Sequence, residues 1–242
     1  MMIEVWSDFM CPFCFIGKRR LENALAQFEH RDQVKVQFRS FELNPAAARD
    51  SRHTMPEELA AKYGVSVEQA EAMNKNLEAQ ARTVGLNYNL NAIVPTNSFD
   101  AHRLTHWADT QGKMAELSER LFKAVLEEAQ HIGSVEVLAD LAAEAGLDHA
   151  EAAAVLAGDR FTEEVRRDEA QAQQLGINGV PFFVLNGKFA VSGAQPDEVF
   201  ADALQRAWNE QSPFTIVESQ DQPDGAVCTE DGCEIPQGNG KE

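Results

Sequence analysis

Cys11-Pro12-Phe13-Cys14 is the stretch from which the fold of this chain can be worked out. It follows an apolar run, residues 3–6, that has the character of a β-strand, and it precedes residues 15–25, whose pattern indicates an α-helix. Two cysteines therefore stand where a strand leads into the N-terminus of a helix. The unpaired N–H groups and the dipole of a helix N-terminus favour a thiolate over a thiol. Cys11, at the start of the helix, is the candidate nucleophile, and Cys14, one turn inside, is the candidate resolving thiol.

The composition excludes several classes of function. The chain has 242 residues, with 21 Lys and Arg against 39 Asp and Glu, for a formal charge of -18. Such an acidic protein is repelled by phosphates, so we expect no nucleic-acid partner. No apolar run approaches the roughly 18 residues that a membrane helix needs, and the N-terminus lacks the pattern of a secretory signal. We therefore expect a cytoplasmic protein with no membrane partner, where a Cys-x-x-Cys pair is more often catalytic, sensing or metal-binding than structural.

The first half of the chain combines a βαβ unit with a long helical block. Residues 34–41 alternate apolar and polar side chains and predict a second strand, parallel to the first, reached by a right-handed crossover. From about residue 55 to residue 175 only helical signals occur. Capping boxes at residues 54–57 and 66–69 predict two helix starts. We expect the helical methionines Met73 and Met114 to lie in the core.

The β pattern returns after the helical block. Residues 180–185 and 188–191 predict two strands joined by Asn186-Gly187, the preferred pair for a type I′ hairpin turn. Residues 195–208 predict a last helix, with a proline near its first position and acidic side chains in its first turn. A βαβ unit and a hairpin with its helix together form the thioredoxin pattern.

The composition changes again at the C-terminus. Residues 212–242 are polar and rich in proline and glycine, which predicts a flexible tail. The tail holds Cys228 and Cys233. Three interpretations remain open for this pair: a second redox pair that exchanges with Cys11 and Cys14, a local disulfide that staples the tail, or a metal site.

The arrangement resembles the DsbA superfamily, and most closely its FrnE-like members, which are related to 2-hydroxychromene-2-carboxylate isomerase and kappa-class glutathione transferase. The resemblance covers about residues 2–210 and is carried by four segments: 8–14, 41–45, 97–104 and 176–183. It implies an α/β, thioredoxin-like fold made of residues 1–45 and 176–211. An inserted all-helical domain, residues 46–175, interrupts that fold, as in DsbA.

The resemblance implies a thiol–disulfide oxidoreductase that acts on disulfide- or thiol-containing proteins or small molecules, without a metal or an organic cofactor. The isomerase and transferase relatives work with glutathione and usually have serine where this chain has Cys11, so the intact dithiol favours disulfide exchange. A glutathione-dependent isomerase or transferase acting on a small aromatic substrate is the alternative, with glutathione as co-substrate. A zinc-binding or redox-sensing module is a third interpretation. Some relatives dimerise, which leaves a homodimer open.

Further site residues follow from the resemblance and from their positions. Val180-Pro181 is expected to be a cis peptide that faces the thiols and binds substrate. Phe13, between the cysteines, is expected to be exposed and to contact unfolded peptide. Asp8 is either a proton acceptor or an ordinary loop or helix-capping carboxylate. His102 and Arg103 either line a substrate groove or are, respectively, a satisfied core histidine and a surface arginine.

Overall fold

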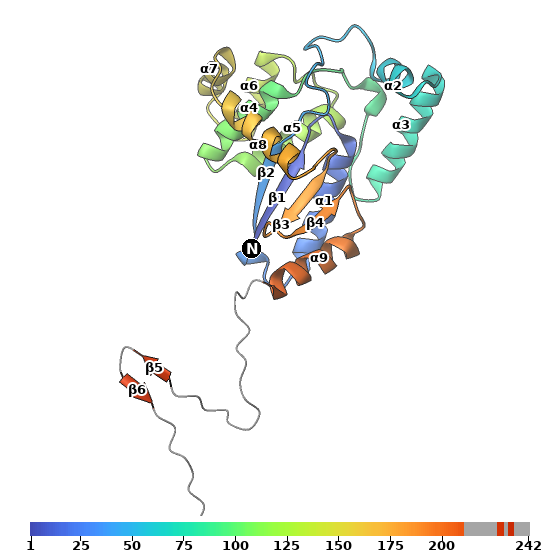
Figure 1. The fold of residues 1–242 in the computed structure, drawn as a ribbon. Helices are drawn as coiled ribbons and strands as arrows, with labels where there is room; N and C mark the ends of the chain where they lie inside the picture. The colour runs from blue at the N-terminus through green and yellow to red at the C-terminus, as the bar shows by residue number, and fades with distance from the viewer. Residues whose placement is uncertain (211–226, 230–231, 235–242) are drawn as a thin grey trace, which may run out of the picture.

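The computed structural model describes residues 1–210 and two short segments, 227–229 and 232–234 (Figure 1). Within residues 1–210 a mixed sheet has the strand order β2-β1-β3-β4. β1 (Met2–Ser7) runs parallel to β2 (Lys35–Ser40) and antiparallel to β3 (Phe182–Leu185), which pairs with the antiparallel β4 (Phe189–Ser192). α1 (Pro12–Ala26) connects β1 to β2, and α9 (Asp197–Asn209) follows β4. The predicted α/β thioredoxin-like fold is confirmed.

The two faces of the sheet follow the two-residue period of its strands. Ile3 and Val5 of β1 pack with α1 and α9, in a core that also contains Phe183 and Phe200. Trp6 points to the opposite face and packs under α8. The hairpin between β3 and β4 turns at Asn186 and Gly187, whose φ angles are 51° and 67°, so the predicted type I′ turn is confirmed.

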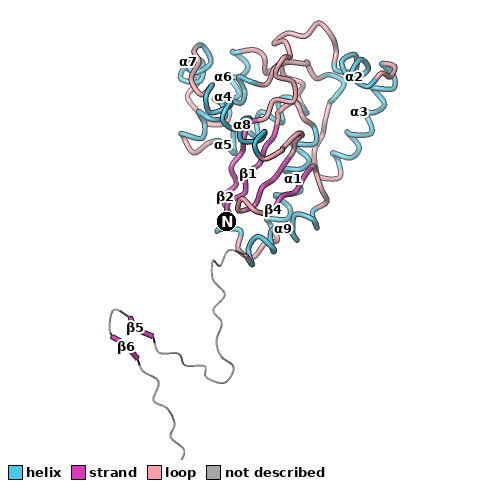
Figure 2. Tube along the Cα trace, in the orientation of Figure 1, coloured by secondary structure: helices cyan, strands magenta, loops and turns pink. Residues whose placement is uncertain are grey.

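Between β2 and β3, the described residues form α-helices, loops and one short 3₁₀ turn, and they form no strand, as predicted. Figures 1 and 2 show one pair of helices standing apart from the other five, across the end of the sheet where α1 begins. The pair consists of α2 (Met55–Tyr63) and α3 (Val67–Arg82), and both predicted capping boxes form at its N-termini. The larger group contains α4 (Phe99–Thr110), α5 (Met114–Leu126), α6 (Val135–Glu144), α7 (His149–Ala157) and α8 (Thr162–Gln174).

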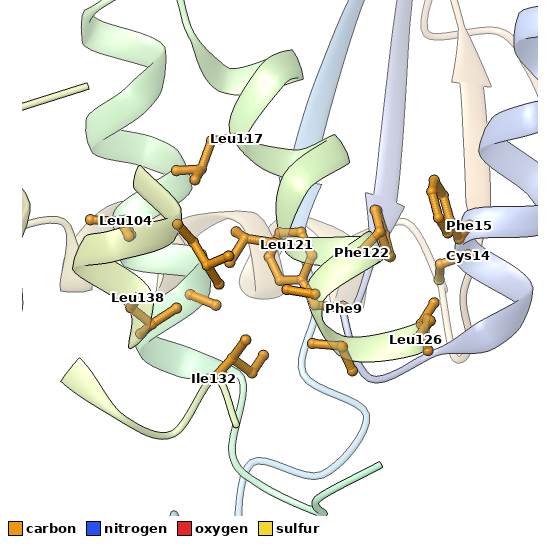
Figure 3. Close-up of a cluster of buried hydrophobic side chains, with 14 of the residues drawn as sticks. Phe9, Cys14, Phe15, Leu104, Leu117, Leu121, Phe122, Leu126, Ile132 and Leu138 are labelled. Atoms are coloured by element: carbon orange, nitrogen blue, oxygen red, sulfur yellow. The ribbon is translucent and has the colours of Figure 1, made fainter. Parts of the chain in front are cut away.

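A single apolar core joins α1 to this larger group (Figure 3). The ring of Phe122 in α5 lies 5.1 Å from that of Phe15 and 5.0 Å from that of Phe9, measured between centroids. Cys11 and Cys14 belong to the same core. The two thiols therefore lie where the end of the sheet, α1 and the helical block pack against one another. No helix within the described residues is long and apolar enough to span a bilayer.

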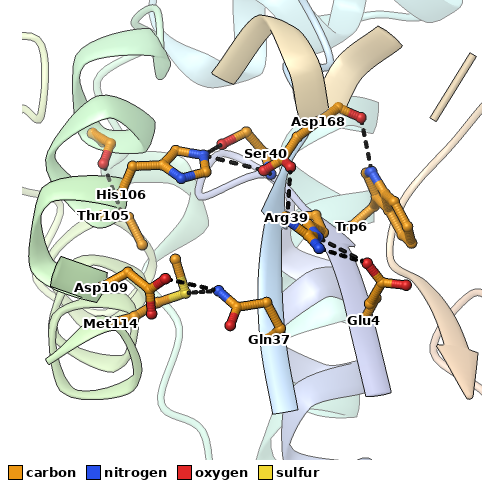
Figure 4. Close-up of polar contacts among 11 residues, drawn as sticks. Glu4, Trp6, Gln37, Arg39, Ser40, Thr105, His106, Asp109, Met114 and Asp168 are labelled. Atoms are coloured by element: carbon orange, nitrogen blue, oxygen red, sulfur yellow. Dashed lines mark hydrogen bonds and ion pairs between the residues drawn. The ribbon is translucent and has the colours of Figure 1, made fainter. Parts of the chain in front are cut away.

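A second connection runs through the buried carboxylate of Asp168 in α8 (Figure 4). It accepts a 2.9 Å hydrogen bond from the Ser40 backbone N–H and a 3.2 Å bond from the Arg39 guanidinium. Nε2 of His106, in α4, lies 3.1 Å from the same carboxylate, and Trp6 donates its indole N–H to the Asp168 carbonyl at 3.0 Å. This one side chain fastens α8 and α4 to the edge of the sheet.

We expect Asp168→Ala to lower the free energy of unfolding by about 3 kcal/mol, because the Ser40 N–H and the Arg39 guanidinium would lose a buried acceptor. Urea unfolding measures the change. Asp202→Ala is the matched control, since it removes a carboxylate from an ion pair with Arg206 that is more than half exposed at both side chains. That variant should cost less than about 1 kcal/mol. Equal losses in the two variants would contradict the anchoring role of Asp168.

Candidate active site

Cys11 is the N-cap of α1, and Pro12 takes the first helical position, where a missing N–H costs nothing. The S–H of Cys11 points to the carbonyl oxygen of Val180, with a distance of 3.6 Å between sulfur and oxygen. The Val180–Pro181 peptide bond is cis, as predicted. The loop before β3 and the start of α1 thus lie on two sides of the Cys11 sulfur.

Gly17 lets α1 approach this loop. A Cβ at position 17 would lie 3.0 Å from Cγ of Pro181 and 3.1 Å from Cζ of Phe183, closer than side-chain carbons normally pack. The absence of a side chain at this position therefore sets the distance between the helix carrying the thiols and the loop carrying the Val180 carbonyl.

Cys14 lies one turn inside α1, and 2% of it is exposed. Burial raises the pKa of the Cys14 thiol well above its ordinary value, and the hydrogen bond and charge of Cys11 act in the same direction. Cys14 is therefore a protonated thiol in the resting site. It can attack a neighbouring sulfur only if a nearby group takes its proton.

Asp8 follows β1, and its carboxylate is buried, with 1% of the residue exposed. Oδ1 accepts a hydrogen bond of 3.1 Å from the N–H of Met10, and Oδ2 accepts one of 2.7 Å from the N–H of Leu43. Nε2 of His102 lies 3.8 Å from Oδ1. Asp8 is thus no exposed loop carboxylate: it connects three segments that are far apart in the sequence.

The balance of forces on Asp8 keeps it ionised. Burial acts to raise the pKa of its carboxyl, but the charge of His102, whose Nε2 lies 3.8 Å away, together with the N–H groups of Leu43 and Met10, holds that pKa below its ordinary value. The resulting negative charge is one of the causes that raise the pKa of the Cys14 thiol. The site therefore places an ionised carboxylate beside a buried, protonated thiol.

The structure does not place His102 or Arg103 in a substrate groove. His102 is 3% exposed, and its ring packs on Phe9 with centroids 4.9 Å apart, so it is a core histidine, but its Nε2 lacks the hydrogen-bond partner that a satisfied histidine would have among the described residues. Arg103 is also 3% exposed, so the prediction of a surface arginine is wrong. Its guanidinium pairs with Asp100 at 2.8 Å and donates to the Val155 carbonyl at 2.7 Å. Both side chains lie on parts of α4 that pack inward.

A cavity of about 730 Å³ opens beside Cys11, between the start of α1 and the helices α2 and α3. We call it the thiol groove. Its walls are mainly apolar and include Met10, Phe13, Leu43, Met55, Leu59, Tyr63, Met73 and Leu77. Phe13 is 44% exposed, as expected for a residue between the two cysteines. Cys11 lines the thiol groove and Cys14 does not.

Several of these residues were not found by sequence reasoning. Met73 is 44% exposed on the groove wall, so its predicted place in the core is wrong, whereas Met114 is buried as predicted. Tyr88 donates its hydroxyl to the Pro12 carbonyl at 2.7 Å, and burial raises the pKa of this phenol, which keeps it a donor. No local pattern marks Tyr88. The segment around Leu43 contributed to the resemblance, but the sequence did not predict that the N–H of Leu43 binds Asp8.

The tail cysteines are described through their backbone alone. β5 (Val227–Thr229) pairs antiparallel with β6 (Gly232–Glu234), and the register sets Cys228 opposite Cys233. The described part of the chain leaves out residues 211–226, 230–231 and 235–242. The predicted flexibility of the tail concerns these residues and stays a prediction.

The fold and the dithiol site define an enzyme of the thioredoxin-fold disulfide oxidoreductase and isomerase class. The chain matches the DSBA-like thioredoxin domain over residues 2–205 and belongs to that family.

Similar proteins include a crystal structure of a probable DsbA oxidoreductase from Streptomyces coelicolor, which is 44% identical, with a TM-score of 0.85 and coverage of 98% of this chain and 100% of that one. The protein YwbO of Bacillus subtilis is 30% identical over 204 residues, which cover 84% of this chain and 94% of YwbO. The cytosolic disulfide reductase DsbM of Pseudomonas aeruginosa shares the fold at 19% identity, with a TM-score of 0.58 and coverage of 86% and 99%.

Proposed function

We propose that this protein catalyses thiol–disulfide exchange, with Cys11 as the nucleophile and Cys14 as the resolving thiol. The observation that carries the proposal is the unequal placement of the two sulfurs. Both residues are buried, but Cys11, at the N-cap of α1, lines the thiol groove, whereas Cys14, one turn inside the helix, does not. A nucleophile has to reach an external disulfide, whereas a resolving thiol only has to reach the nucleophile.

The proposed reaction has two steps. The Cys11 thiolate attacks one sulfur of the substrate disulfide, forms a mixed disulfide and releases the other sulfur as a thiolate. Cys14 then attacks the Cys11 sulfur, closes the Cys11–Cys14 disulfide and releases the second substrate sulfur. Two electrons pass from the dithiol to the substrate, and the reverse sequence oxidises a substrate dithiol. We assign Asp8 as the acceptor of the Cys14 proton in the second step.

The thiol groove favours polypeptide substrates with apolar residues near the disulfide. Phe13, Leu43, Tyr63 and Met73 are each at least 44% exposed and all line it. Exposed apolar surface of this kind marks a binding site, and flexible methionine side chains adapt to varied partners. The Val180 carbonyl, next to Cys11, offers an acceptor to the backbone N–H of an extended substrate.

We propose a cytoplasmic location and net reduction of substrates, because the cytosol keeps thiols reduced. The dithiol supplies both electrons, so the exchange itself calls for no metal or organic cofactor. Glutathione then enters as a thiol co-substrate that restores the reduced enzyme.

Disulfide reduction should depend on the two cysteines in different ways. In an insulin reduction assay, Cys11→Ser should abolish turnover, because no thiolate can attack from the thiol groove. Cys14→Ser should also lose turnover but should accumulate a mixed disulfide with substrate, which mass spectrometry detects. Full activity of Cys11→Ser would contradict the proposal. Activity of Cys14→Ser that is retained with glutathione and a small aromatic substrate would favour the isomerase or transferase alternative instead.

Met73→Glu should raise the KM for reduction of an apolar, disulfide-bonded peptide by about tenfold, since it places a charge where an apolar side chain should bind. The rate with a small aromatic disulfide should change much less. Val199→Glu is the matched control, because Val199 is 41% exposed on α9 and does not line the thiol groove. Equal effects of the two substitutions would show that the groove does not bind the peptide.

We also propose that Cys228 and Cys233 form a second redox pair that exchanges with Cys11 and Cys14. The backbone register that sets them opposite each other is compatible with a disulfide between antiparallel strands. The double variant Cys228→Ser/Cys233→Ser should therefore shift the rate at which the Cys11–Cys14 disulfide is reduced by glutathione. Unchanged kinetics and an unchanged reduction potential would leave the tail cysteines outside the reaction.

A further inference from the structure

His102 of α4 presents an unusual buried group. Only 3% of the residue is exposed, and its Nε2 has no hydrogen-bond partner among the described residues. Oδ1 of Asp8 lies 3.8 Å from Nε2, too far for a hydrogen bond, and the imidazole is held in this position by packing on Phe9. An unpaired buried nitrogen costs stability, so its orientation toward a buried carboxylate calls for a reason.

We propose that His102 is a positioning residue of the resolving step: its imidazole, 3.8 Å from Oδ1, holds Asp8 as the charged carboxylate that accepts the Cys14 proton. This inference rests on the proposed function, since it concerns the second step of the exchange. It gives the helical block a part in the chemistry, because His102 comes from α4, whereas the thiols come from the N-cap and the first turn of α1.

The step can be written with all atoms accounted for. The proton of the Cys14 thiol moves to Oδ1 of Asp8 as the Cys14–Cys11 sulfur–sulfur bond forms. The bond between Cys11 and the substrate sulfur breaks, and that sulfur leaves as a thiolate, which takes a proton from water in the thiol groove. Cys14 and Cys11 are oxidised to a disulfide and the substrate sulfur is reduced. Asp8 ends the step as a neutral carboxylic acid, and Oδ1 is its oxygen nearer to Nε2 of His102.

The surroundings of Asp8 identify His102 as the group that controls its charge. Cys11, the N-cap of α1, and Cys14, in its first turn, contribute thiols and no positive charge. The segment after β2 contributes the N–H of Leu43, and the residues before α1 contribute the N–H of Met10. Among the described residues, His102 is the one basic side chain within ion-pair distance of Asp8. If His102 is removed, only the neutral N–H groups of Met10 and Leu43 oppose the effect of burial, which raises the pKa of Asp8.

The sign of the pH effect follows. Without His102, the pKa of Asp8 rises, so the carboxylate is protonated at a higher pH and can no longer accept the Cys14 proton. The acidic limb of the pH–rate profile for the resolving step should move to higher pH. A neighbouring charge shifts a pKa by about one unit or more, and one unit corresponds to a tenfold change in rate on that limb.

The test separates the two steps in rapid-mixing experiments with a fluorogenic disulfide. His102→Phe keeps a ring to pack on Phe9 but removes the nitrogen. Its resolving step should show the acidic limb shifted upward by about one pH unit, with a rate about tenfold lower on that limb. Formation of the mixed disulfide, measured in Cys14→Ser with and without His102→Phe, should be the same. His102→Gln keeps an N–H donor without the charge and should shift the limb in the same direction, but less.

His106→Phe is the matched control. It removes the other histidine of α4 that contacts a buried aspartate, Asp168, so it should cost stability while leaving the pH profile of the resolving step unchanged. If His102→Phe fails to fold, His102→Gln decides the result. A wild-type profile in the folded His102 variants would overturn this inference alone. Failure of Cys14→Ser to form a mixed disulfide would overturn the proposed function itself.

Discussion

The buried carboxylate of Asp8 is the constraint on which the site depends. A charge is tolerated in an apolar core only if hydrogen bonds and an opposite charge replace the water it has lost. Asp8 meets that requirement with the N–H groups of Met10 and Leu43 and with the imidazole of His102. These partners come from the turn before α1, the segment after β2 and the helix α4. Satisfying one charge therefore brings together the sheet, the thiols and the helical block.

The same hydrogen bonds shape the thiol groove. Met10 and Leu43, whose backbone N–H groups bind Asp8, both line that groove beside Cys11. The group proposed to accept the Cys14 proton is thus also the group that holds two parts of the groove wall. Proton transfer to Asp8 would change the strength of both hydrogen bonds, which connects the chemical state of the thiols to the surface that a substrate contacts.

The helical block also does more than cover the end of the sheet. α2 and α3 supply the outer wall of the thiol groove, and α4 supplies the only basic partner that the described residues give to Asp8. Asp168 and His106 fasten α8 and α4 to the edge of the sheet, which fixes the distance between these helices and α1. A thioredoxin-like unit of four strands and two helices would lack both the groove wall and the histidine.

The amino-acid sequence by itself determined the order of the elements, the dithiol at the start of α1, the capping boxes and the hairpin turn, because each depends on residues close together in the chain. It could not determine the positions of His102, Arg103 and Met73. Most of α4 is buried, so its apolar pattern does not tell which side faces the thiols, and the helical spacing of Met73 fits a core as well as a groove wall. Only the tertiary structure decided that Leu43 and His102 both approach the carboxylate of Asp8, because that arrangement depends on how separate segments satisfy one buried charge.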